Sequence, residues 1–152
     1  MRGIAVLAAV LAVTGTAGAQ QLQPSATITA STYEHAAKPV ALTYKLRYEM
    51  QCGNPGKGPL TLTFPAQVAV PRVSAADVLL NGKSAPAVTR SGSTLVVSFP
   101  PPPTIMCDVI GMGTLTVTIT KTAGLANPKK AGLYTFPVTS DKISAMPKLR
   151  IG

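Results

Sequence analysis

Two cysteines carry the most definite chemistry in this chain. Cys52 and Cys107 are its only thiols, and no cluster of histidines or carboxylates accompanies either one. In an oxidising compartment, a single pair of cysteines in a small domain forms a disulfide. Two free thiols or half of a metal site are the alternatives. We predict a Cys52–Cys107 disulfide, which would stabilise the fold by about 4 kcal/mol through loop closure.

The groups needed for catalysis are scarce. His35 is the only histidine, and no Gly-x-Ser-x-Gly elbow presents a serine nucleophile to it. A glycosidase needs two carboxylates facing each other across a cleft, whereas the acidic residues here are dispersed along the chain. The sequence therefore predicts a protein that is not an enzyme and that holds no cofactor. The acidic residues are Glu34, Glu49, Asp77, Asp108 and Asp141.

A copper carrier is the alternative hypothesis, because soft methionine ligands and imidazole suit copper. His35, Met106 and Met112 are the candidate ligands, and the two methionines flank the Cys107 region. Methionine is also a common filler of irregular gaps in protein cores. We expect Met50 to have that role, because it falls on the alternating apolar positions of a strand.

Basic residues offer a second kind of binding chemistry. The net charge is +9 for the whole chain and +8 without Arg2. Such a charge attracts anionic surfaces, so an anionic envelope polymer or another envelope protein is a candidate partner, although solubility alone could also explain it. Aromatic residues are too few to interleave with the cations as nucleic-acid readers require, so no sequence-specific nucleic acid is expected. The candidate contact residues are Lys45, Arg47, Lys129, Lys130, Lys148 and Arg150.

The N-terminus has the pattern of a cleavable signal peptide. An apolar run from Ile4 to Val13 follows Arg2, and it is about half the ~20 residues of a membrane-spanning helix. Ala17-Gly18-Ala19 matches the small-x-small cleavage pattern, which predicts a signal peptide over residues 1–19. The rest of the chain contains no second such run, so no transmembrane segment is expected there. We predict export to the periplasm, the cell surface or the medium.

Alternating side chains predict an all-β domain over residues 25–140. From Val40 to Cys52 every second residue is apolar, so this strand should bury one face and expose the other, with Cys52 on the buried side, where a bridge between two sheets would need it. Asn81-Gly82 predicts a tight hairpin turn. About seven or eight strands separated by turn signals are typical of an antiparallel sandwich. Residues 20–24 are expected to be a flexible leader, and residues 141–152 a basic, unpaired tail.

One stretch resembles a known family. The sequence AGLANPKKAGLY, from Ala123 to Tyr134, is similar to a hairpin of immunoglobulin-like modules in bacterial secreted and cell-surface proteins. Val78 to Gly82 resembles a second hairpin of these modules. The resemblance implies an immunoglobulin-like sandwich whose last two strands are joined at the motif, with Lys129 and Lys130 at its tip. It also implies a spacer or adhesive role, although no tryptophan is present to pack on an inter-sheet disulfide.

Together these features predict a non-enzymatic exported protein that acts through surface contacts. Binding, adhesion and a purely structural role are all compatible with them.

Overall fold

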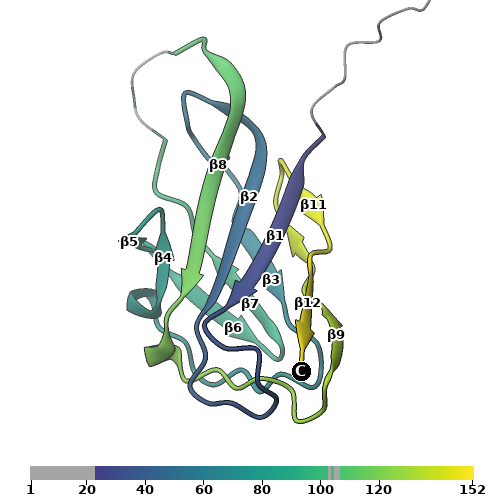
Figure 1. Cartoon of the computed structure of the whole chain (residues 1–152). Helices are drawn as coiled ribbons and strands as arrows, with labels where there is room; N and C mark the ends of the chain where they lie inside the picture. Colours follow the sequence, from purple (N-terminus) through teal and green to yellow (C-terminus); the bar gives the residue numbers. More distant parts are fainter. Residues whose placement is uncertain (1–22, 103, 105–106) are drawn as a thin grey trace, which may run out of the picture.

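A computed structural model describes residues 23–102, 104 and 107–152, and the predicted signal peptide and Met106 lie outside this part of the chain. The described chain forms two five-stranded sheets and a two-stranded ribbon (Figure 1). Every strand pair is antiparallel, which confirms the all-β prediction.

The first sheet contains, in spatial order, β1 (Ser25–Ala30), β2 (Leu42–Gln51), β8 (Ile110–Ile119), β4 (Val78–Leu80) and β5 (Lys83–Ser84). The second contains β11 (Ser144–Ala145), β10 (Val138–Thr139), β3 (Leu60–Thr63), β7 (Thr94–Val97) and β6 (Val88–Ser91). The ribbon pairs β12 (Lys148–Ile151) with β9 (Gly132–Thr135). Two short 3-10 turns, η1 (Ala75–Asp77) and η2 (Lys121–Ala123), complete the described elements.

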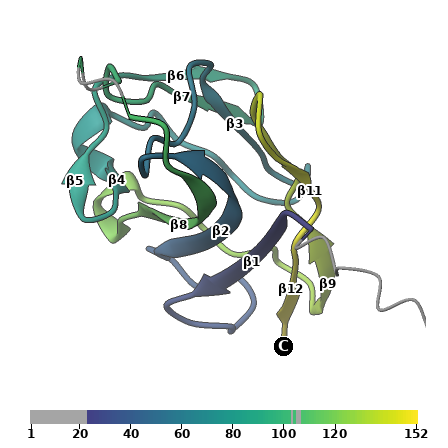
Figure 2. The same cartoon turned by 90° about the horizontal axis from the view of Figure 1, so that it is seen from above.

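The core lies between the two sheets, which Figure 2 shows as two layers seen from above. The alternation predicted for β2 is confirmed: Tyr44, Leu46 and Tyr48 are fully buried, while Lys45 and Arg47 are exposed. Strands β3 and β7 supply the opposite side of the core. Because the central strands alternate in this way, both sheets bury one face and leave the other to solvent.

The turn prediction at Asn81-Gly82 is also confirmed. Asn81 and Gly82 have φ angles of 48° and 83°, and they connect β4 to β5. The Asn81 side chain accepts a hydrogen bond from the Thr116 amide at 2.8 Å, which ties this hairpin to β8. Asparagine and glycine suit the turn because they tolerate positive φ.

The resemblance to a strand-joining hairpin fails at the AGLANPKKAGLY stretch. Strand β8 pairs with β2 and β4, whereas β9 pairs with β12, so the motif does not join two paired strands. Its middle runs as a crossing segment, with single bridges from Leu125 to Val40 and from Ala126 to Ala69.

The prediction of an unpaired tail over residues 141–152 is wrong as well. Residues from this segment form β11 and β12, and Leu149 and Ile151 are buried. Alternation within Lys148–Ile151 places the two apolar side chains in the core and the two cations in solvent. The fold therefore extends to the end of the chain described by the structure.

Candidate functional site

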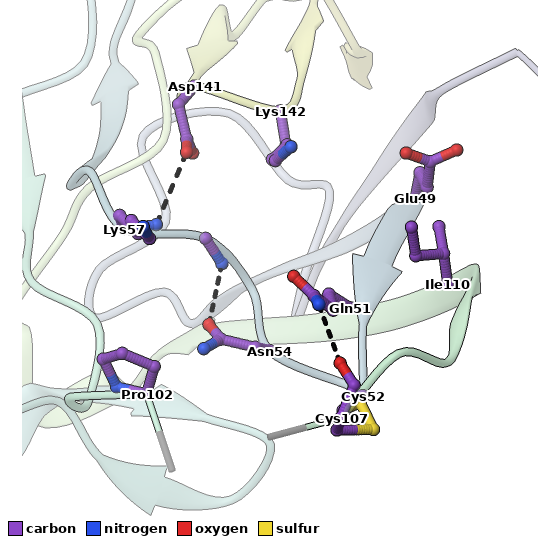
Figure 3. Close-up of a pocket in the computed structure, with 11 residues that line it drawn as sticks. Glu49, Gln51, Cys52, Asn54, Lys57, Pro102, Cys107, Ile110, Asp141 and Lys142 are labelled. Atoms are coloured by element: carbon purple, nitrogen blue, oxygen red, sulfur yellow. Dashed lines mark hydrogen bonds between the residues drawn. A yellow bond between two sulfur atoms is a disulfide. The ribbon is translucent and has the colours of Figure 1, made fainter. Parts of the chain in front are cut away.

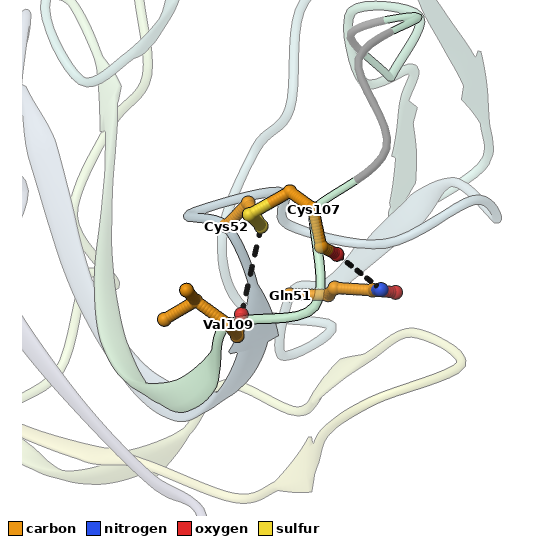
Figure 4. The surroundings of a disulfide bond; sticks show 4 residues. All are labelled: Gln51, Cys52, Cys107 and Val109. Atoms are coloured by element: carbon orange, nitrogen blue, oxygen red, sulfur yellow. Dashed lines mark hydrogen bonds between the residues drawn. A yellow bond between two sulfur atoms is a disulfide. The ribbon is translucent and has the colours of Figure 1, made fainter.

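The predicted disulfide forms, but at a different place from the one expected. Cys52 is bonded to Cys107, with their Cα atoms 6.1 Å apart and a sequence separation of 55 (Figure 4). Cys52 follows the end of β2, and Cys107 precedes the start of the neighbouring strand β8. The bond therefore clasps the ends of two strands in one sheet, and the expectation of a bridge between sheets is wrong.

A chain reversal at Cys52 explains this placement. Cys52 has a φ of 54° and Gly53 of 71°, so strand alternation ends at Gln51 and no longer directs the thiol into the core. The Cys52 amide donates to the Val109 carbonyl at 2.8 Å. The Gln51 side chain donates to the Cys107 carbonyl at 2.7 Å (Figure 4). These bonds hold the segment between Cys107 and β8 against the end of β2.

Two large apolar side chains are exposed beside this clasp. Val109 is 71% exposed and Ile110 is 62% exposed. We call Val109 and Ile110, with the Cys52–Cys107 bond that holds them, the apolar tip. Figure 1 shows the start of β8 at the top of the view, above the other strands, so the tip lies at one end of the sandwich.

A groove of about 520 Å³ opens beside the apolar tip (Figure 3). Asp141, from the turn between β10 and β11, accepts a 3.4 Å hydrogen bond from the Lys57 amide. Gly56, with a φ of 126°, lies so close to the Asp141 carboxylate that a β-carbon would collide with it. The polar residues lining the groove are Glu49, Gln51, Asn54, Lys57, Asp141 and Lys142.

The groove is lined by charged groups of both signs. Two carboxylates and two ammonium groups line it, and both of its cysteines are in the disulfide. Neither serine nor histidine is among the described lining residues. Tyr48 lies close by, where its hydroxyl donates to the Pro55 carbonyl at 2.9 Å. Burial, and secondarily the charge of Asp141, raises the pKa of Tyr48, so this phenol stays neutral and serves as a donor.

The predicted cationic residues are all exposed, but they occupy two surfaces. Lys45 and Arg47 lie together on the outer face of β2. Lys148 and Arg150 lie on the solvent side of β12. Lys129 and Lys130 directly precede β9, whose residue Gly132 pairs with Ile151, so they lie beyond the end of β12. The ribbon therefore gathers four of the six cations, and β2 holds the other two.

The structure does not bring the proposed copper ligands together. His35 lies at the end of the sandwich where β1 passes to β2, with its Nδ1 atom 3.1 Å from the Gly152 carbonyl oxygen. Met112 pairs with Glu49, towards the opposite end of β2. Most of the length of β2, about 23 Å at the usual rise per residue, separates the two. Met106 lies outside the described residues.

Two absences hold for the part of the chain that the structure describes. No group of three or more His, Cys, Asp or Glu side chains is placed to hold a metal ion there. No helix there is both long and apolar enough to cross a membrane.

Val109 and Ile110 are the site residues that the sequence analysis missed. Ile110 shares the strand parity of Met112 and Thr114, which face away from the core, so an extension of the β8 alternation by four residues would have indicated an exposed isoleucine. For Val109 no comparable signal exists, since it precedes the strand.

Comparison with known proteins gives a likeness in fold. No protein-family model matches the sequence. No curated protein matches it either. Among solved structures, the chain is similar to the crystal structure of BslA, a bacterial hydrophobin, with a TM-score of 0.52 and 18% identity over 85% of this chain and 96% of that chain. At this identity the likeness concerns the arrangement of the strands and not the chemistry of any site.

Proposed function

We propose that this chain is an exported, non-enzymatic protein that acts by contact, and that its apolar tip adsorbs to apolar surfaces. The observation that carries the proposal is the exposure of Val109 and Ile110, 71% and 62%, next to each other at one end of the sandwich. Water contact with apolar side chains costs free energy, which is recovered when the side chains enter an apolar phase.

The disulfide explains how the tip stays open to solvent. A flexible loop carrying valine and isoleucine would gain free energy by folding back onto the sandwich. The Cys52–Cys107 bond and the Cys52–Val109 hydrogen bond fix the segment to the end of β2. The two side chains are thereby presented before any surface is met, so little conformational entropy is lost on adsorption.

Three features support export and a contact role. The signal-peptide pattern over residues 1–19 predicts export, and a disulfide is typical of exported proteins. The fold is similar to that of a protein described as a bacterial hydrophobin.

The test is adsorption of the mature protein, residues 20–152, to an oil–water interface, measured as the fall in interfacial tension of a pendant drop. We expect the wild type to lower the tension and V109S/I110S to lower it much less. Both side chains are exposed, so the substitutions should leave the fold intact, which circular dichroism would check.

The matched control is L133S/M146S. Leu133 is 55% exposed and Met146 is 70% exposed, but both lie away from the tip. This variant removes a comparable amount of exposed apolar surface and should adsorb like the wild type. Equal losses in the two variants would contradict a site at the tip, and no adsorption by the wild type would contradict the proposed function.

A further inference from the structure

The outer face of the first sheet carries an ordered array of hydroxyl groups around two cations. Three strands contribute to it, and their register aligns their residues in rows. Arg47 lies between Ser25 and Thr114, and Lys45 lies between Thr27 and Thr116. A third row contains Thr29, Thr43 and Thr118. We call these nine residues the hydroxyl grid.

Strand geometry fixes the dimensions of the hydroxyl grid. Neighbouring strands are about 4.8 Å apart, and alternate residues along a strand are about 6.7 Å apart. All nine side chains are exposed or half-buried, while the residues between them in β2 and β8 point into the core. In the third row the hydroxyls of Thr43 and Thr118 are 3.4 Å apart. The face is thus a regular array of hydrogen-bonding groups on a rigid support.

The cations of the grid have neutral neighbours. Each is flanked on both adjacent strands by a hydroxyl residue instead of a carboxylate. Their positive charge is therefore not offset by cross-strand partners, and it adds to the field of a chain whose charge is +8 without Arg2. Strand β12, which contacts β1, carries the further exposed cations Lys148 and Arg150.

We infer that the hydroxyl grid binds a linear anionic polysaccharide, the two cations pairing with its carboxylates and the threonines hydrogen-bonding its hydroxyl groups. Charge complementarity supports this occupant, since the nine residues include two cations and no acid, and the nearest acid on this face of β2 is Glu49, beyond Arg47. Repeated rows along the strands match a polymer with repeated charges, because successive units can meet equivalent groups.

Other occupants fit the face less well. Single-stranded nucleic acid binds through aromatic platforms, and none of the nine residues is aromatic. A lipid or oil surface needs exposed apolar side chains, and the nine residues are a serine, threonines and two cations. If two copies of the protein packed through this face, Lys45 and Arg47 of one copy would face the same residues of the other, and the like charges would repel.

This inference does not depend on the apolar tip, because the grid lies on a side face of the sheet and the tip at its end. The probe is alginate, a polymer of uronic acids, with uncharged dextran and single-stranded DNA as comparison polymers. Binding to the mature protein is measured by isothermal titration calorimetry at low and at physiological ionic strength. We expect alginate to bind more tightly than either comparison polymer and to weaken with salt.

Two variants of the hydroxyl grid, each with a control variant elsewhere, locate the binding. K45Q/R47Q should weaken alginate binding about tenfold, as the loss of two exposed charge contacts predicts. K129Q/K130Q removes the same charge elsewhere and should change it less than about threefold. T27V/T116V, which keeps shape and charge, should also weaken binding, whereas T89V on β6 should not.

Several results would overturn the inference. These are no alginate binding by the wild type, tighter binding of DNA than of alginate, equal losses of alginate affinity in K45Q/R47Q and K129Q/K130Q, or no effect of T27V/T116V. A failure of V109S/I110S to alter oil adsorption would contradict the proposed function and leave the grid unaffected, so the two failures are distinguishable.

Discussion

Two tyrosines on the buried face of β2 show how one hydroxyl can stabilise the protein and another can cost it stability. Tyr44 is fully buried, and its hydroxyl has no hydrogen-bond partner among the described residues. Tyr48 is also buried, but its hydroxyl donates to the Pro55 carbonyl. A buried hydroxyl without a partner costs free energy, because its bonds to water are lost on folding.

Replacing each tyrosine by phenylalanine should therefore have opposite effects. We expect Y44F to raise the free energy of unfolding by about 1 kcal/mol and Y48F to lower it by about 1 kcal/mol. Both changes keep the ring, so packing is matched between them. Urea unfolding at neutral pH measures both values. A Y44F protein less stable than the wild type would show that the Tyr44 hydroxyl has a partner.

Asn127 shows what the sequence could not reveal at the residue scale. The resemblance described above places Asn127 in a hairpin whose tip is exposed. Instead Asn127 is 5% exposed, and its amide group donates to the carbonyls of Thr32 and Glu34 at 3.0 and 2.8 Å. It anchors the crossing between β1 and β2. The bonded residues are over 90 positions away, so no local pattern could indicate them.

At the scale of elements, the predictions that succeeded rest on local geometry. The alternation of apolar residues correctly predicted which side chains from Tyr44 to Met50 are buried. The tolerance of asparagine and glycine for positive φ correctly predicted the Asn81-Gly82 turn. Pairing partners are not local: β9 pairs with β12 and not with β8. The same limit applies to Cys52, because alternation predicts direction only while the strand continues, and the strand ends at Gln51. The immunoglobulin-like topology stays a prediction.

For the candidate site too, local features could be predicted from the sequence and contacts between distant strands could not. The two cysteines and six exposed cations were identified from residue type alone, because the chemistry of a thiol or a charged group does not depend on the fold. The hydroxyl grid needed the register between three strands, which sequence does not give. Short strands such as β5, β10 and β11, two residues each, also escaped the alternation criterion, since two residues show no period.

The disulfide supports a prediction about one pair of elements. C52A/C107A should lower the free energy of unfolding by about 2–5 kcal/mol, through the loss of loop closure. Because the bond joins the ends of β2 and β8, amide hydrogen exchange should rise first near Gln51 and Ile110 and least at Leu42 and Ile119, which pair at the other end. Urea unfolding and exchange mass spectrometry measure both effects. Exchange that rises uniformly along the two strands would contradict a local clasp.

At the scale of the molecule, β2 links the two proposed surfaces. Its outer face carries Lys45 and Arg47 of the hydroxyl grid, and its end is bonded through Cys52 to the apolar tip. In Figure 1 strands β2 and β8 run lengthwise away from the tip, so a protein adsorbed by its tip would keep the side of the first sheet exposed to water. The fold could therefore hold a polymer next to an apolar surface without either contact blocking the other.

This arrangement predicts recruitment. Fluorescently labelled alginate should gather at the surface of oil droplets when the wild-type mature protein is present, as seen by microscopy. V109S/I110S should bind alginate in solution but leave droplets dark, because the complex no longer adsorbs. K45Q/R47Q should adsorb yet recruit little polymer. The controls L133S/M146S and K129Q/K130Q should recruit like the wild type. Saturating alginate that displaces the protein from the droplets would show that the surfaces compete, since two independent contacts require adsorption to persist with polymer bound.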